Sequence, residues 1–179
     1  MNIKNKNLLI FSALLLIVFT LIFLSKFLKF KAYSNNTSTI YLIYSPTCPH
    51  CHHLKEFLKT KSLTNVSIIE STDAMKAYYC LKEKNFDWNF GVPILFAYSN
   101  GKLIVIQGYP SSLQDVNGYF GGKDVEEKYC KDMNGKPVYD ENKNYLYCVM
   151  NNIILGNKYS VEYLIDLCEK NFCEKFCSL

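Results

Sequence analysis

Two cysteines, Cys48 and Cys51, stand two residues apart, a spacing that lets their sulfurs join and separate with little movement of the backbone. Pro49 and His50 lie between them, and a helical pattern follows, so both sulfurs fall in the first turn of a helix. Unpaired backbone N–H groups and the helix dipole favour negative charge there, and a protonated or hydrogen-bond-donating His50 adds to that effect. We therefore expect Cys48 to attack a disulfide as a thiolate and Cys51 to release the mixed disulfide. The candidate catalytic set is Cys48, Pro49, His50 and Cys51.

The segments around this motif predict an α/β protein. Short runs rich in β-branched and aromatic residues indicate strands, and apolar residues at helical spacing indicate helices. The expected elements, in order, are a strand at 39–44, a helix at 49–61, a strand at 66–70, a helix capped by Asp73, strands at 93–98 and 102–106, and a helix beginning at Ser160. The two consecutive strands are joined by Ser99-Asn100-Gly101, and Asn-Gly between apolar runs is a strong hairpin signal.

Residues 110–158 do not fit this order of elements and are interpreted as an insertion before the last helix. Cys130 and Cys148 flank a polar stretch around Asn134 and Gly135. We expect a structural disulfide, Cys130–Cys148, to staple this insertion. Closing a loop of that length contributes roughly 3 kcal/mol of stability in the loop-entropy model.

The motif and its context resemble the thioredoxin superfamily. The Cys-Pro-His-Cys sequence is the one found in DsbA-like oxidases and some relatives, and Gly91-Val92-Pro93 looks like the family's cis-proline segment. The resemblance covers roughly residues 39–106 and the last helix. It implies a thioredoxin-like fold, with a mixed central sheet flanked by helices and no cofactor. It also implies that the Val92–Pro93 bond is cis, that Pro93 packs beside Cys48, and that the Val92 backbone binds the substrate chain.

Two departures from the family pattern bear on the direction of the reaction. Leu42 stands where thioredoxin carries a buried acid, and Pro46-Thr47 replaces the tryptophan that precedes the motif in thioredoxin. The resemblance therefore implies a thiol–disulfide oxidoreductase that acts on protein thiols and disulfides, as an oxidase or isomerase rather than a reductase. A further redox partner, soluble or in the membrane, is expected without being identified.

The N-terminus is expected to anchor the chain in a membrane. Residues 7–25 carry no charged side chain, and at about 1.5 Å per residue they span about 28 Å, close to the hydrocarbon thickness of a bilayer. A cleaved signal peptide is the alternative, but the apolar run is longer than usual and no small-x-small cleavage site follows it. We expect an anchor at 1–31, a linker at 32–38 and a thioredoxin-like domain at 39–179.

The eight cysteines place that domain outside the cytoplasm, because exported domains use such numbers of cysteines in disulfides. The lysines on the two sides of the apolar run are balanced and do not decide the orientation. Besides Cys130–Cys148, we interpret Cys80 as an ordinary buried thiol and expect one further disulfide among Cys168, Cys173 and Cys177. All 20 basic residues are lysine, which disfavours nucleic-acid recognition because arginine's bidentate contacts are missing.

Three other interpretations of the motif stay open. Cys48, Cys51, His52 and His53 offer thiolate and imidazole ligands for zinc or copper(I) delivery, although we expect no metal. The order Cys-Pro-His-Cys-His also satisfies the c-type haem pattern, with His52 as one ligand. A methionine would be the second haem ligand, and the candidates are Met75, Met133 and Met150. Lastly, a Cys48–Cys51 disulfide in a redox-inert adaptor would be only structural.

Overall fold

The computed structural model describes residues 16, 18–20, 37–110 and 122–179. The chain divides into two compact units, Met1–Asn36 and Thr37–Leu179. Apart from residues 16 and 18–20, the predicted membrane anchor at residues 1–31 lies outside the described residues, as does most of the predicted linker at residues 32–38. Within the part of the chain that is described, no helix has the length and apolar character needed to cross a bilayer.

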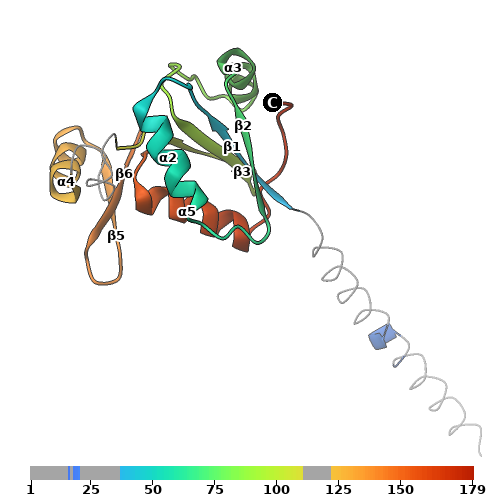
Figure 1. Cartoon of the computed structure of the whole chain (residues 1–179). Helices are drawn as coiled ribbons and strands as arrows, with labels where there is room; N and C mark the ends of the chain where they lie inside the picture. Colours follow the sequence, from blue (N-terminus) through green and yellow to red (C-terminus); the bar gives the residue numbers. More distant parts are fainter. Residues whose placement is uncertain (1–15, 17, 21–36, 111–121) are drawn as a thin grey trace, which may run out of the picture. The chain divides into compact units, whose positions relative to one another are not determined.

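The second unit contains seven strands and four helices within its described residues, and it confirms the predicted α/β class. In chain order these elements are β1 (Ser38–Ile43), α2 (Pro49–Lys59), β2 (Val66–Ser71), α3 (Ala74–Glu83), β3 (Ile94–Ser99), β4 (Lys102–Gln107), α4 (Lys123–Asp132), β5 (Lys136–Tyr139), β6 (Tyr145–Met150), β7 (Ile153–Leu155) and α5 (Lys158–Lys170). Figure 1 shows them in sequence colours.

All seven strands join one mixed sheet in the order β2-β1-β3-β4-β7-β6-β5. The β1–β2 and β4–β7 pairs are parallel, and the other neighbours are antiparallel. Asn100 and Gly101 turn the β3–β4 hairpin with φ of 51° and 77°, the left-handed values that a two-residue turn between twisted strands requires. The hairpin predicted from the sequence is confirmed.

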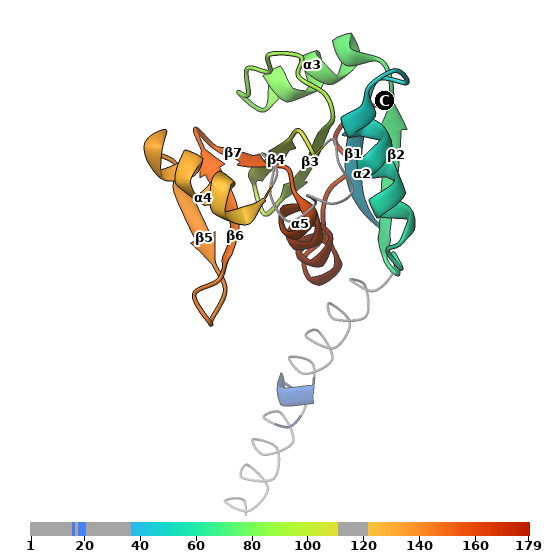
Figure 2. The same cartoon turned by 60° about the vertical axis from the view of Figure 1, so that its left-hand side comes forward.

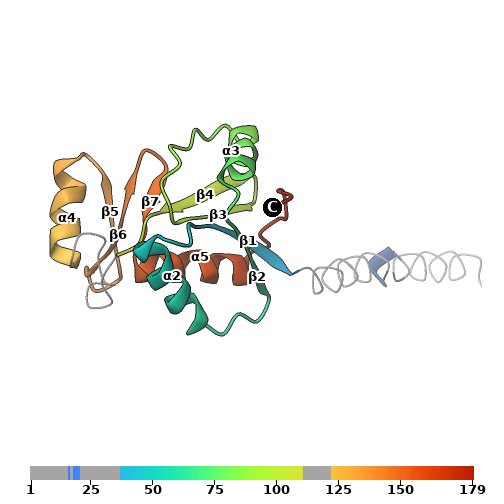
Figure 3. The same cartoon turned by 45° about the horizontal axis from the view of Figure 1, so that its top comes forward.

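Helices cover both faces of the sheet, as Figure 3 shows, with α2 and α5 on one side and α3 on the other. Side chains alternate along β1, so Ile40 and Leu42 pack in the core under α2 and α5, whereas Tyr41 and Ile43 pack in the core under α3. All four are fully buried. A strand that is apolar on both faces fits only a sheet covered on both sides, which agrees with the uninterrupted apolar run in the sequence.

The insertion extends the sheet instead of forming a separate loop. Its described part contributes α4 and three strands, and β7 pairs with the free edge of β4. In Figure 2 the α4, β5 and β6 group lies at one end of the sheet. This extension was not predicted, because β7 has only three residues and carries no periodic signal of its own.

The insertion is tied to the last helix through a buried polar group. Asn157 caps α5 and forms a capping box with Ser160, so this helix begins at Lys158, two residues before the predicted start at Ser160. Asn157 Nδ2 also donates to Glu126 Oε1 in α4 at 3.0 Å, and Tyr145 donates its hydroxyl proton to the same oxygen. All these polar side chains are buried. The Asn157–Glu126 bond therefore ties the start of α5 to α4, and the Tyr145–Glu126 bond joins β6 to the same carboxylate.

Candidate active site

Cys48 lies between the end of β1 and the first turn of α2. Residues 44–47 leave the sheet in a turn, and the Cys48 amide closes it by donating to the Ser45 carbonyl at 3.2 Å. Cys48 itself is the N-cap of α2, and Pro49 takes the first helical position. Proline suits that position, since its fixed φ is helical and its missing N–H would have no helical partner. The local sequence therefore places the first cysteine where the unpaired N–H groups of the helix are.

The Cys48 sulfur is half-buried and has two polar neighbours. It accepts a hydrogen bond from the Cys51 amide at 3.2 Å, and its thiol donates to the Val92 carbonyl at 3.8 Å. The Val92–Pro93 peptide bond is cis, and Pro93 accepts a hydrogen bond from the Gly108 amide at 2.8 Å. The structure thus brings together Cys48, Cys51 and Val92, three residues that the sequence singled out from two distant segments.

Cys51 lies one turn further along α2 and is buried, with only 1% of its surface exposed. Burial, followed by a hydrogen bond with Cys48, raises the pKa of the Cys51 thiol from its ordinary value of 9.0 to about 12. At neutral pH Cys51 is therefore a protonated thiol. The two cysteines differ in exposure, because Cys48 is partly exposed to solvent and Cys51 is buried.

The three histidines of the motif point to three different places. His50 hydrogen-bonds through Nδ1 to the Tyr109 carbonyl at 2.5 Å, so Nδ1 carries the proton and that nitrogen is not available to Cys48. His52 hydrogen-bonds through Nε2 to the Pro46 carbonyl at 2.7 Å. His53 Nδ1 is buried and has no hydrogen-bond partner among the described residues.

The ligand sets of the alternative interpretations are not assembled. Among the described residues, no three histidine, cysteine or acidic side chains converge on a possible metal position, so Cys48, Cys51, His52 and His53 do not form the zinc or copper site considered from the sequence. The methionines considered for haem lie on three separate elements: Met75 is in α3, Met133 caps α4 and Met150 is in β6.

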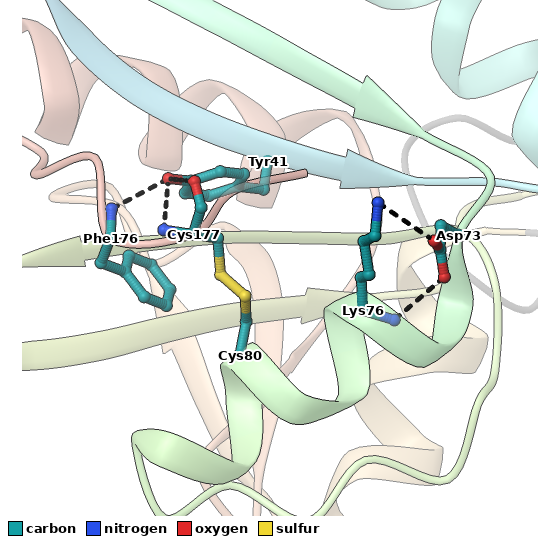
Figure 4. The surroundings of a disulfide bond; sticks show 6 residues. All are labelled: Tyr41, Asp73, Lys76, Cys80, Phe176 and Cys177. Carbon is teal, nitrogen blue, oxygen red and sulfur yellow. Dashed lines mark hydrogen bonds and ion pairs between the residues drawn. A yellow bond between two sulfur atoms is a disulfide. The ribbon is translucent and has the colours of Figure 1, made fainter.

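The other six cysteines are joined in pairs. Cys130–Cys148, the pair predicted from the sequence, links α4 to β6. Cys168–Cys173 joins the end of α5 to the segment after it. Cys80–Cys177 joins α3 to the C-terminal tail, as Figure 4 shows, so the interpretation of Cys80 as an unpaired thiol is wrong. The tail is also held by β1, because the Tyr41 hydroxyl accepts hydrogen bonds from the Phe176 and Cys177 amides.

Tyr109 is the residue of the site that the sequence analysis missed. Its carbonyl holds His50, its ring lies 5.9 Å from the Phe57 ring of α2, and it is fully buried. Burial also raises the pKa of its hydroxyl. No local signal identifies it, because it lies 59 residues after His50.

Comparisons of the chain with protein-family models, curated proteins and solved structures find no match.

Proposed function

We propose that the protein is a thiol–disulfide oxidoreductase whose reacting atoms are the sulfurs of Cys48 and Cys51. One observation carries the proposal: among the eight cysteines, these two alone are free, and they share the first turn of one helix. A structural disulfide would have no need for a solvent-accessible sulfur at a helix N-terminus. A nucleophilic thiolate needs both features, since backbone N–H groups stabilise the anion and access admits the substrate.

A thioredoxin-like arrangement is the fold we propose for residues 39–179, and the order of elements supports it. A parallel β1–α2–β2 unit is followed by the antiparallel β3–β4 hairpin and, after the insertion, by α5. The loop before β3 reaches back to the start of α2, so that the Val92 carbonyl lies beside Cys48. The same contact supports the proposal that the Val92 backbone binds the substrate chain.

The exchange reaction follows from the difference between the two thiols. In oxidation, a substrate thiolate attacks Cys48 Sγ of the Cys48–Cys51 disulfide, the bond between the two cysteines breaks, and Cys51 takes up a proton. A second substrate thiolate then attacks the substrate sulfur of the mixed disulfide and releases Cys48. The substrate loses two electrons and two protons, and the cysteine pair gains them. Cys51 ends as a buried thiol, the form that its raised pKa favours.

We propose oxidation or isomerisation rather than reduction as the main direction. A reductase resolves its mixed disulfide by deprotonating the buried second cysteine, and a nearby carboxylate is one way to take that proton. Here the main influences on the Cys51 pKa are its burial and its neighbours Cys48 and Ser45; no carboxylate of the described residues is among them. Leu42 is fully buried in β1 at the position where thioredoxin has its acid.

The N-terminal anchor and the extracytoplasmic location remain part of this proposal. Three disulfides between separate segments support an oxidising compartment, because cytosolic proteins seldom keep such bonds. Protein thiols and disulfides are the proposed substrates.

The test uses the full chain and two matched serine variants. With a disulfide-bonded peptide, Cys51→Ser should accumulate a stable mixed disulfide at Cys48, detected by mass, whereas Cys48→Ser should form none. The reduction potential of the wild-type pair, measured in glutathione buffers, should be more oxidising than about −270 mV, the value of thioredoxin. A lower potential would overturn the proposed direction. A Cys48 that forms no mixed disulfide would overturn the enzymatic function.

A further inference from the structure

An aromatic cluster lies on the segment that leads to Val92. Phe90 stacks on Tyr78 of α3, with ring centroids 5.1 Å apart and planes at 18°, and it lies at the same distance from the Trp88 ring. Trp88 is buried and donates its indole N–H to the Gly91 carbonyl at 3.2 Å, so the base of the cluster is fixed. Phe90 is 45% exposed. The cluster therefore presents one aromatic ring to solvent on a rigid support.

The backbone at Phe90 is unfavourable for a bulky side chain. Its φ is 64°, in the left-handed region. The other non-glycine residues with positive φ in the described part of the chain are five asparagines and one lysine, and asparagine tolerates this region far better than an aromatic residue does. Core packing does not account for the strain, because nearly half of the side chain is in solvent. Bulky residues kept in such conformations cluster at ligand contacts and active sites.

Phe90 precedes, by two residues in the sequence, the residue whose carbonyl contacts the proposed reacting sulfur. Only Gly91 separates it from Val92, whose carbonyl lies 3.8 Å from Cys48 Sγ. We therefore expect a polypeptide joined to Cys48 by a mixed disulfide to pass along this segment. An extended chain advances about 3.3 Å per residue. Two or three residues of an extended substrate are therefore about as long as the stretch of this chain from Val92 back to Phe90.

We propose that Tyr78, Trp88 and Phe90 bind an apolar or aromatic side chain of the substrate, two or three residues from the cysteine that reacts with Cys48. This inference rests on the proposed function and adds the class of substrate: extended or unfolded polypeptide with a large apolar residue near its cysteine. Phe90 supplies the contact surface, and its strained backbone keeps the ring outside the core.

The test compares two peptides on the full chain carrying Cys51→Ser. Each peptide holds one cysteine as a mixed disulfide with glutathione, and the residue two positions away is Phe in one and Gly in the other. Attack of Cys48 on the peptide sulfur forms the protein–peptide disulfide and expels glutathione as its thiolate, so the adducts are counted by mass. The Phe peptide should react faster, by about tenfold, the effect of one aromatic contact.

Substitutions at Phe90 then separate binding from folding. Phe90→Asn, which suits the positive φ, should abolish the preference for the Phe peptide while the melting temperature stays the same or rises. Phe90→Tyr should keep the preference, because the ring is retained. Tyr139→Asn removes another exposed aromatic side chain, in β5 of the insertion, and should leave the preference unchanged.

The outcomes distinguish the inference from the function on which it rests. Equal rates for both peptides, or a preference that survives Phe90→Asn, would overturn the aromatic site and leave the redox function intact. A fall in melting temperature with equal slowing of both peptides would show that Phe90 is structural. A wild-type dimer that Phe90→Asn dissociates would assign the ring to an interface between copies, against the proposal. Absence of both adducts would instead reject the redox function itself.

Discussion

The start of α2 and the α4–β6 region each hold two cysteines, but the first pair is free and the second is joined in a disulfide. Cys48 and Cys51 come from one helical turn, and the first sulfur is half-exposed. Cys130 and Cys148 come from a helix and a strand, and both are fully buried. A bond between separate elements is fixed by everything packed around it, whereas a bond within one turn can open without moving any element. We infer that the first pair is suited to turnover and the second to stability.

The largest expected effects are on stability, from the three structural disulfides. In the loop-entropy model, loss of Cys80–Cys177, whose partners are 97 residues apart, should lower the free energy of unfolding by about 5 kcal/mol. The Cys130–Cys148 pair, 18 apart, should give about 3 kcal/mol, and the Cys168–Cys173 pair, 5 apart, about 2 kcal/mol. Denaturant unfolding of paired alanine variants measures this series.

The same variants test whether the Cys48–Cys51 pair works independently of the structural disulfides. Mixed-disulfide formation at Cys48 should proceed at wild-type rates in the Cys130→Ala/Cys148→Ala variant, because that bond lies outside the proposed site. A parallel loss of stability and of exchange would mean that the two regions depend on each other.

A smaller effect is expected from the glycine beside the α4–β6 disulfide. A Cβ atom on Gly135 would lie 2.7 Å from Cys148 Sγ, 2.8 Å from Cys130 Sγ and 2.9 Å from Met150 Cγ, all closer than real contacts. Gly135→Ala should therefore destabilise the protein by about 2 kcal/mol through overpacking. Removing both cysteines should relieve most of that penalty, since two of the three close atoms disappear. Additive losses in the triple variant would contradict the packing explanation.

The sequence predicted those features that depend on residues close together in the chain. The Cys48–Cys51 turn, the Asp73 cap and the Asn100-Gly101 hairpin all follow from residues within a few positions of one another, and each was predicted. Asp73 does accept a hydrogen bond from the Lys76 amide at 3.0 Å.

The contacts that the sequence did not predict are those between distant segments. Cys80 and Cys177 are far apart in the chain, and the six cysteines outside the Cys48–Cys51 motif allow many pairings, so local pattern cannot choose among them. The hydrogen bond of His50 to the Tyr109 carbonyl and the pairing of β7 with β4 were missed for the same reason, because each joins distant segments. A short strand such as β7 forms because it pairs with β4 on one side and with β6 on the other.

A third prediction concerns the histidine between the two cysteines. His50→Ala removes its hydrogen bond to the Tyr109 carbonyl and any positive charge beside the start of α2. The loss should amount to about 1 kcal/mol of stability and should make the Cys48/Cys51 couple less oxidising, by up to about 30 mV for each 1.4 kcal/mol of lost thiolate stabilisation. His52→Ala is the matched control, because His52 bonds only the Pro46 carbonyl nearby, and it should leave the potential unchanged. Equal shifts of the redox potential in both variants would mean that loss of any histidine near the motif has this effect, and that the position of His50 does not matter.

The smallest predicted effect is a pH dependence of stability that comes from the buried Cys51 thiol, and it is absent at neutral pH. Burial raises the pKa of Cys51 to about 12 from 9.0. Near neutral pH, well below the ordinary pKa of 9.0, the thiol is protonated in both the folded and the unfolded reduced protein, so it adds no pH dependence there. As the pH rises from 9 toward 12, the unfolded chain loses this proton and the folded protein keeps it, and the stability of the folded state falls. Tyr147, whose pKa burial raises to about 12, contributes in the same direction and must be subtracted.

Reduced wild-type protein and the Cys51→Ala variant provide that subtraction, because both retain Tyr147. The difference between their free energies of unfolding, followed from pH 7 to pH 11, should be constant near neutral pH and shrink as the pH passes through 9, since only the wild type loses stability through Cys51. A difference that stays flat would mean that the thiol ionises equally well in the folded state. Cys51 would then be as accessible as Cys48, and the contrast between an attacking and a buried sulfur in one helical turn would disappear.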